Sequence, residues 1–93
     1  MPLRQVTGKK VGHIVLYALS TCPECRRAKD LLDDLGFDYY FEDVDLNSGD
    51  DQRHIMAEVS RWNTKRSFPT IVINNQRAII GFNEAEIRRL GAP

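Results

Sequence analysis

Both cysteines of this chain lie in the stretch Ser20-Thr21-Cys22-Pro23-Glu24-Cys25-Arg26-Arg27. The stretch follows a continuous apolar run, residues 14–19, which is typical of a strand buried on both faces of a sheet. Pro23 predicts the first turn of a helix, because proline lacks an amide proton and its fixed φ suits the first helical position. Apolar side chains then recur at steps of three and four residues before a glycine, as on one face of a helix: Cys25, Ala28, Leu31, Leu32, Leu35 and Gly36. The cysteines therefore stand at a strand-to-helix junction.

This junction gives the two cysteines different environments. Cys22 is expected at the N-cap, where unpaired amides and the positive end of the helix dipole favour a thiolate. Arg26 and Lys29 lie one helical turn beyond the two cysteines and add positive potential, which Glu24 opposes. Cys25 lies on the apolar face of the helix. We expect Cys22 to attack a disulfide and Cys25 to resolve the mixed disulfide that results.

Metal binding and a purely structural role fit the cysteines less well. A structural zinc site needs four ligands, and the remaining soft ligands, His13 and His54, do not have zinc-finger spacing. A purely structural disulfide would close so short a loop that it would remove little entropy from the unfolded chain. Four aspartates match no calcium loop and indicate a solvated strand end and helix start: Asp43, Asp45, Asp50 and Asp51. We therefore predict no metal site.

Length and composition indicate one small domain. The 93 residues include thirteen basic and thirteen acidic side chains, so we expect no nucleic-acid or membrane surface. No apolar run is long enough for a signal-peptide core or a membrane span. We expect residues 1–12 to form an N-terminal tail or an edge extension, with a possible strand over 3–6, and residues 13–93 to form the domain. We expect a cytoplasmic monomer, since paired cysteines beside a βαβ pattern are more often redox-active than structural there.

The remaining segments predict a small mixed sheet. Residues 38–45 predict a second strand, parallel to the first because a helix connects the two. A turn over 47–50 ends in an N-cap at Asp50, and the next helix has one apolar face: Ile55, Met56, Val59 and Trp62. Strands over 70–73 and 77–80 form an antiparallel hairpin around residues 74–76.

A last short helix completes the prediction. Asn83 with Glu86 three residues later is close to a capping box, and Ile87 and Leu90 supply the apolar face before Gly91. The order is therefore β-α-β-α-β-β-α. It predicts an α/β fold with a four-stranded mixed sheet flanked by helices on both faces.

Several motifs together resemble the glutaredoxin family, which has the thioredoxin-like fold. The resemblance runs from about residue 13 to the C-terminus and lies in the strand through Tyr17, residues 20–25, Val44-Asp45, residues 67–70 and Gly81-Phe82. It implies a thiol–disulfide oxidoreductase that reduces disulfides of client proteins or mixed disulfides of glutathione, in electron transport and cell redox homeostasis. In this family the proline matching Pro69 is cis, and the residue before it offers its backbone to the partner's chain beside the dithiol.

The resemblance also implies the residues of the site. Cys22 and Cys25 would be catalytic. The substrate or glutathione site would comprise Thr21, Pro23, Glu24, Arg66, Phe68, Pro69, Gly81, Phe82 and Asn83. Glutathione would be a co-substrate, and no tightly bound cofactor is implied.

Three residues depart from the usual glutaredoxin pattern. Leu19 stands where a lysine usually helps to hold a glutathione carboxylate, Glu24 replaces an aromatic residue, and Phe82 replaces the second glycine of a Gly-Gly pair. The motif that ends in Phe82 instead resembles redoxins that donate electrons to ribonucleotide reductase and are reduced by thioredoxin reductase, a flavoprotein. In that alternative, Phe68, Phe82 and Trp62 would form an apolar rim around Cys22 for a protein partner.

A third possibility is a binding module rather than an enzyme. Two chains could share a metal or an iron–sulfur cluster through their cysteine pairs, as some glutaredoxins do with glutathione. Pro23 and the second cysteine argue against it, because cluster-binding relatives commonly have a single active cysteine or a small residue in place of the proline. Visible absorbance of anaerobically purified protein distinguishes the two, since a cluster absorbs there and a dithiol does not.

Overall fold

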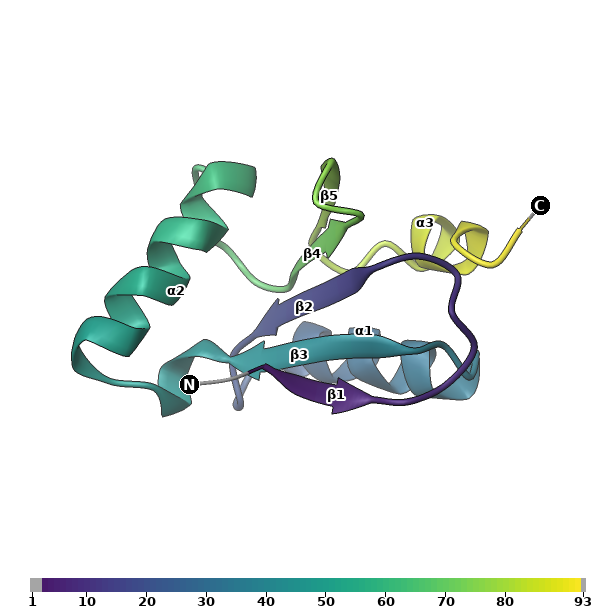
Figure 1. The fold of residues 1–93 in the computed structure, drawn as a ribbon, viewed down its shortest axis with the longest axis horizontal. Helices are drawn as coiled ribbons and strands as arrows, with labels where there is room; N and C mark the ends of the chain where they lie inside the picture. The colour runs from purple at the N-terminus through teal and green to yellow at the C-terminus, as the bar shows by residue number, and fades with distance from the viewer. Residues whose placement is uncertain (1–2, 93) are drawn as a thin grey trace.

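The computed structural model describes residues 3–92 and has the predicted order of elements, with one strand added near the N-terminus. The elements are β1 (Arg4–Val6), β2 (Ile14–Ala18), α1 (Pro23–Asp34), β3 (Tyr39–Asp43), the 3₁₀ turn η1 (Val44–Leu46), α2 (Gly49–Trp62), β4 (Thr70–Ile73), β5 (Arg77–Ile80) and α3 (Glu84–Arg89). Within that range, five strands form one mixed sheet in the order β1-β3-β2-β4-β5 (Figure 1). The predicted α/β class is confirmed, and the predicted count of four strands is one too few.

The central strand is β2, which runs parallel to β3 and antiparallel to β4. All five of its residues are buried, as its unbroken apolar run predicts. The parallel pairing confirms the expected crossover through α1. The hairpin of β4 and β5 is also confirmed, with residues 74–76 between the paired Ile73 and Arg77. Asn74 and Asn75 have φ values of 55° and 52°, and Gln76 donates its N–H to the Ile73 carbonyl at 3.0 Å, as in a type I′ turn.

The additional strand, β1, pairs antiparallel with the outer edge of β3, where Gln5 lies opposite Tyr40. Residues 1–12 show no strand-like period, so the pairing depends on backbone groups that the β3 edge offers rather than on a local signal. Gly8 allows the chain after β1 to approach closely, because a Cβ atom there would lie 2.5 Å from the carbonyl oxygen of Gly36. Residues 4–6 thus form an edge strand, one of the two expectations for this segment.

Helices cover both faces of the sheet, as predicted, and alternate residues of β2 point to opposite faces. Leu16 packs in a core cluster with side chains of α1 and α3, whereas Val15 and Tyr17 pack in a second cluster with side chains of α2. Figure 1 shows α1 behind the sheet and α2 well separated from α1. The first cluster contains the apolar face predicted for α1: Cys25, Ala28, Leu31 and Leu32, with Leu35 at its margin. The second contains the face predicted for α2: Ile55, Met56, Val59 and Trp62.

Two predicted boundaries between β3 and α2 are wrong. The strand predicted over 38–45 ends at Asp43, and the chain then turns through η1. The side chain of Asn47 donates to the carbonyl of Asp43 at 3.1 Å and to Glu42 Oε1 at 2.5 Å, which favours a turn over a longer ladder. Helix α2 begins at Gly49 with Ser48 at the N-cap, not Asp50, which lies in the first turn. An acidic residue there still suits the positive end of the helix dipole.

Candidate active site

Strand register brings three separate segments to one end of the sheet. The last residue of β2, Ala18, pairs with Asp43, and the residue before it, Tyr17, pairs with Thr70 at the start of β4. Thr70 pairs in turn with Ile80, the last residue of β5. The segments after β2, before β4 and after β5 therefore meet at this end. They carry the cysteines, residues 67–69 and residues 81–83 respectively.

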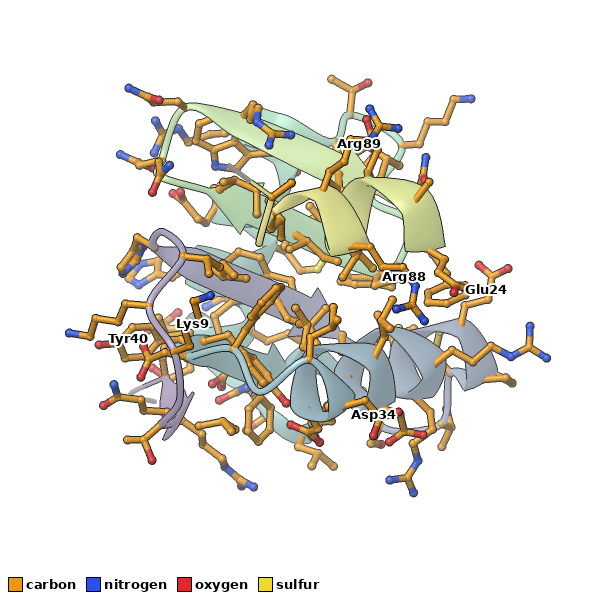
Figure 2. The ribbon with its side chains drawn as sticks, turned by 90° about the vertical axis from the view of Figure 1, so that its right-hand side faces the viewer. Lys9, Glu24, Asp34, Tyr40, Arg88 and Arg89 are labelled. Atoms are coloured by element: carbon orange, nitrogen blue, oxygen red, sulfur yellow. The ribbon has the colours of Figure 1, made fainter. Side chains whose placement is uncertain are left out.

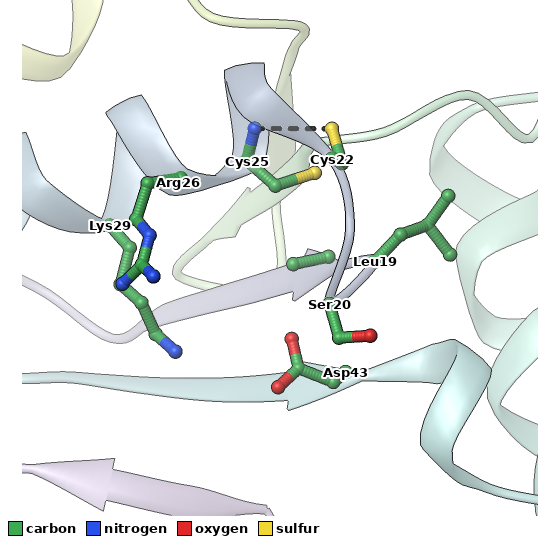
Figure 3. Close-up of a pocket in the computed structure, with 8 residues that line it drawn as sticks. Leu19, Ser20, Cys22, Cys25, Arg26, Lys29 and Asp43 are labelled. Carbon is green, nitrogen blue, oxygen red and sulfur yellow. Dashed lines mark hydrogen bonds between the residues drawn. The ribbon is translucent and has the colours of Figure 1, made fainter.

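Cys22 is the N-cap of α1, as predicted, with φ −91° and ψ 116°. Its Sγ accepts a hydrogen bond from the backbone N–H of Cys25 at 3.2 Å, shown as the dashed line in Figure 3. Its carbonyl accepts from the N–H of Arg26 at 3.0 Å, and Pro23 is the first helical residue. The half-buried sulfur thus lies where helix amides stabilise negative charge.

Cys25 lies one turn further along α1, and only 2% of it is exposed. Burial, and after it a hydrogen bond with Cys22, raises the pKa of the Cys25 thiol to about 12. Both cysteines are free in the structure, so this describes the reduced state, in which Cys25 stays protonated at neutral pH. The pair therefore consists of one accessible sulfur and one buried thiol.

A cleft of about 200 Å³ opens beside the cysteines (Figure 3). Its lining comprises Ala18, Leu19, Ser20, Cys22, Cys25, Arg26, Lys29 and Asp43. The Nζ atom of Lys29 lies 3.7 Å from the centre of the Phe41 ring, a cation–π contact that directs this ammonium toward β3. Positive charge therefore lines the cleft from α1, as the sequence predicts, and Asp43 faces it from the sheet.

The loop before Cys22 is held by Asp45, a residue for which the sequence predicts only a solvated strand end. Asp45 accepts from the backbone N–H of Ser20 at 2.8 Å and from the hydroxyl of the same serine. These hydrogen bonds lower the pKa of Asp45, so the stability they contribute is present at neutral pH and is lost as the pH falls through the lowered pKa. Ser20 and Asp45 lie 25 residues apart, and no local signal indicates their contact.

The segment before β4 contains a cis peptide bond between Phe68 and Pro69, as the family resemblance implied. Within residues 3–92, the N–H and C=O groups of Phe68 make no hydrogen bond. The Phe68 side chain packs against both core clusters. Cys22 and Phe82 also pack against the first cluster, and Leu19 and Trp62 also pack against the second. Phe68 therefore links the cysteine side of the molecule to the end of α2.

The other predicted site residues lie at three places. Thr21, Pro23 and Glu24 are at the start of α1, and Figure 2 shows Glu24 at the outer surface of that helix. Gly81 donates its N–H to the carbonyl of Pro69 at 2.8 Å, which holds the segment after β5 beside the segment before β4. Asn83 caps α3 by accepting from the N–H of Glu86 at 3.1 Å, as predicted. Arg66 is exposed on the loop before Phe68 and has φ 52°.

Two kinds of feature are missing from residues 3–92. No three His, Cys, Asp or Glu side chains are grouped closely enough to bind a metal ion together. None of the helices in this range has the length and apolar character that crossing a bilayer requires.

Native alkylation should separate the two cysteines. We expect iodoacetamide to modify Cys22 in the folded, reduced protein and to leave Cys25 unmodified, because Cys25 is buried and protonated at neutral pH. Peptide mass spectrometry gives the modified positions, and denatured protein, in which both thiols react, is the control. Equal labelling of the two cysteines in the folded protein would contradict their proposed difference.

Comparisons with known proteins agree with this geometry. The model of the family described as "Glutaredoxin" matches residues 14–78. An uncharacterised glutaredoxin-like 8.6 kDa protein in a rubredoxin operon of Clostridium pasteurianum is 34% identical over 83% of this chain and 95% of its own length. The chain spans only 52% to 60% of several matching plant glutaredoxins.

Solved structures share the fold along most of the chain. The glutaredoxin of Methanosarcina mazei has a TM-score of 0.88 and 43% identity, covering 96% of this chain and 87% of its own. The glutaredoxin-like NrdH-redoxin of Escherichia coli has a TM-score of 0.67 and 25% identity, covering 87% and 97% respectively. Because the family model matches most of the chain, residues 14–78, this chain belongs to the glutaredoxin family of thiol–disulfide oxidoreductases.

Proposed function

We propose that this chain reduces disulfides through its Cys-Pro-Glu-Cys motif, with Cys22 as the nucleophile and Cys25 as the resolving thiol. The observation that carries the proposal is the hydrogen bond from the Cys25 N–H to Cys22 Sγ, made at the start of α1 above the buried Cys25 side chain. Only one sulfur is accessible to a client, and the second lies one helical turn away.

The proposed reaction has two exchanges. The Cys22 thiolate attacks one sulfur of the client disulfide, forms a mixed disulfide and releases the other client sulfur as a thiolate. Cys25 then loses its proton to solvent and attacks Cys22 Sγ, which releases the second client sulfur and leaves a Cys22–Cys25 disulfide. The client has gained two electrons. A donor of two electrons restores the dithiol.

The segment before β4 suits a client that binds as an extended chain. The N–H and C=O of Phe68 have no partner within the described range and lie at the cysteine end of the sheet. Such groups can pair with the main chain of a client, while the Phe68 and Phe82 side chains supply apolar contact. The clients we propose are therefore disulfide-containing proteins, reduced by a monomer in the cytoplasm as part of cellular redox homeostasis.

Glutathione is the reductant that the family assignment favours, and exposed Arg66 is available to its carboxylates. A second candidate is a redoxin reduced by a thioredoxin-reductase-like flavoprotein. Leu19 supports this candidate, because it occupies the position at which glutaredoxins usually have a lysine. Its side chain packs in the same apolar cluster as Trp62 and Phe68. The similar NrdH-redoxin is described as glutaredoxin-like with a thioredoxin-like activity profile.

Reduction of the oxidised protein by two donor systems tests these candidates. One system is glutathione with glutathione reductase, and the other is thioredoxin reductase with NADPH. The matched variant is Leu19→Lys, which restores the usual lysine without touching the cysteines. If apolar Leu19 closes the tripeptide site, we expect wild type to turn over much faster with thioredoxin reductase than with glutathione, and Leu19→Lys to raise the glutathione rate about tenfold. Fast turnover of wild type with glutathione would make the chain an ordinary dithiol glutaredoxin.

A further inference from the structure

The loop between α2 and β4 is built around one buried side chain, Asn63. Only 5% of Asn63 is exposed, although it lies at the end of α2, where it is the C-cap. Its Nδ2 atom lies 3.0 Å from each of three oxygens: the Ser67 carbonyl, the Ser67 hydroxyl and the Thr70 hydroxyl. Its Oδ1 atom accepts from the N–H of Lys65 at 3.1 Å. One amide group therefore joins the end of α2 to the start of β4.

The loop has few other sources of order. Its residues 64–67 are exposed, so apolar burial contributes little to their conformation. Arg66 donates its N–H to the Asn63 carbonyl at 2.9 Å and has φ 52°, a conformation that a residue with a Cβ rarely adopts. The Thr70 hydroxyl donates to the Ser67 carbonyl at 2.8 Å. The polar bonds to and around Asn63 thus determine the path of the backbone into Phe68.

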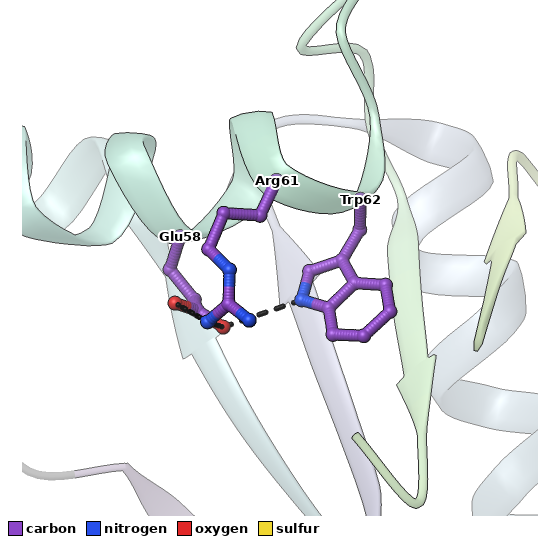
Figure 4. A network of polar contacts seen from close by, with 3 residues as sticks. All are labelled: Glu58, Arg61 and Trp62. Carbon is purple, nitrogen blue, oxygen red and sulfur yellow. Dashed lines mark hydrogen bonds and ion pairs between the residues drawn. The ribbon is translucent and has the colours of Figure 1, made fainter. Parts of the chain in front are cut away.

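The last turn of α2, which leads into Asn63, is itself held in place. Glu58 accepts from the Trp62 indole N–H at 3.2 Å and from Arg61 Nη1 at 3.0 Å, and the Arg61 guanidinium lies 5.5 Å from the Trp62 ring centre (Figure 4). This network orients Trp62, the single tryptophan of the chain, within the cluster that contains Phe68. The fluorescence of Trp62 can therefore report on this region.

We propose that Asn63 is a positioning residue for client binding: it sets the place and direction of the Phe68 main chain, and so the affinity for clients that bind as extended chains. The inference rests on the proposed function. The side-chain hydrogen bonds of Asn63 go to Lys65, Ser67 and Thr70 and not to a cysteine, so it acts on the docking of the client and not on sulfur exchange. A small disulfide without peptide groups cannot pair with the Phe68 backbone and should be insensitive to Asn63.

The test compares two substrates and two variants. The substrates are a peptide containing a disulfide and bis(2-hydroxyethyl) disulfide, which has no peptide groups. Glutathione is left out of both assays, because its exchange with the small disulfide would give a mixed disulfide that carries peptide groups. The variants are Asn63→Ala and the control Asn47→Ala. Asn47 is equally buried and also donates to a carbonyl, but it lies at the opposite end of α2. We expect Asn63→Ala to raise KM for the peptide about tenfold, with kcat/KM for the small disulfide within about twofold of wild type. We expect Asn47→Ala to leave the ratio of the two substrates unchanged.

Stability is measured separately, by urea unfolding followed through Trp62 fluorescence, so that both variants are assayed fully folded. If Asn63→Ala does not fold, Thr70→Val is used, because it removes one acceptor of the Asn63 amide while keeping the side-chain shape. Equal losses on both substrates, or no loss on the peptide, would overturn the inference. Failure of wild type to reduce either substrate would instead contradict the proposed function.

Discussion

Cys22→Ser lowers the rate of client reduction by about a thousandfold or more, since a serine hydroxyl at this N-cap cannot form the mixed disulfide. Cys25→Ser has a different effect. The first exchange still occurs because Cys22 is intact, but the buried serine cannot release the client, and the mixed disulfide accumulates. Single-turnover mass spectrometry measures both results, as the absence of an adduct in the first variant and a stable adduct in the second.

The two variants serve as controls for each other, because each removes one sulfur from the same short motif. A mixed disulfide on Cys25 in the Cys22→Ser variant would reverse the assigned roles. Equal activity of both variants and wild type would show that the dithiol mechanism is wrong for this chain.

Leu32→Ala should lower the free energy of unfolding by about 2–5 kcal/mol, because the Leu32 side chain is fully buried and its truncation leaves a cavity. The residue lies on the face of α1 that packs in the first core cluster, together with Cys25. Loss of this packing weakens the attachment of the helix that presents both cysteines. Urea unfolding followed by Trp62 fluorescence measures the change.

Arg27→Ala is the matched control for this substitution. Arg27 lies on the same helix but is exposed, so its truncation should change stability by no more than about 0.5 kcal/mol. Similar losses in the two variants would contradict the assignment of the Leu32 effect to core packing, because alanine does not lower helix propensity at either position.

The cysteine end of the molecule could largely be predicted because its signals are local. Pro23 after an apolar strand and before a helical period specifies where α1 begins, so both the N-cap position of Cys22 and the burial of Cys25 follow from neighbouring residues. The hairpin around Asn74-Asn75-Gln76 is similarly local, since its asparagines adopt positive φ readily. The boundary errors between β3 and α2 arise where Asn47 competes for backbone groups.

By itself, the sequence determined the order of the helices and strands from β2 to α3, the α/β class and the asymmetric cysteine pair, because periodicity, proline and turn residues act over a few positions. Only the tertiary structure decided the edge pairing of β1, the contact between Asp45 and Ser20, and the bonds from Asn63 across to Thr70. Each of these depends on polar groups that side-chain periodicity does not record. Their partners become neighbours only when strand register has brought distant segments together, and that register also places Phe68 at the same end of the sheet as the cysteines.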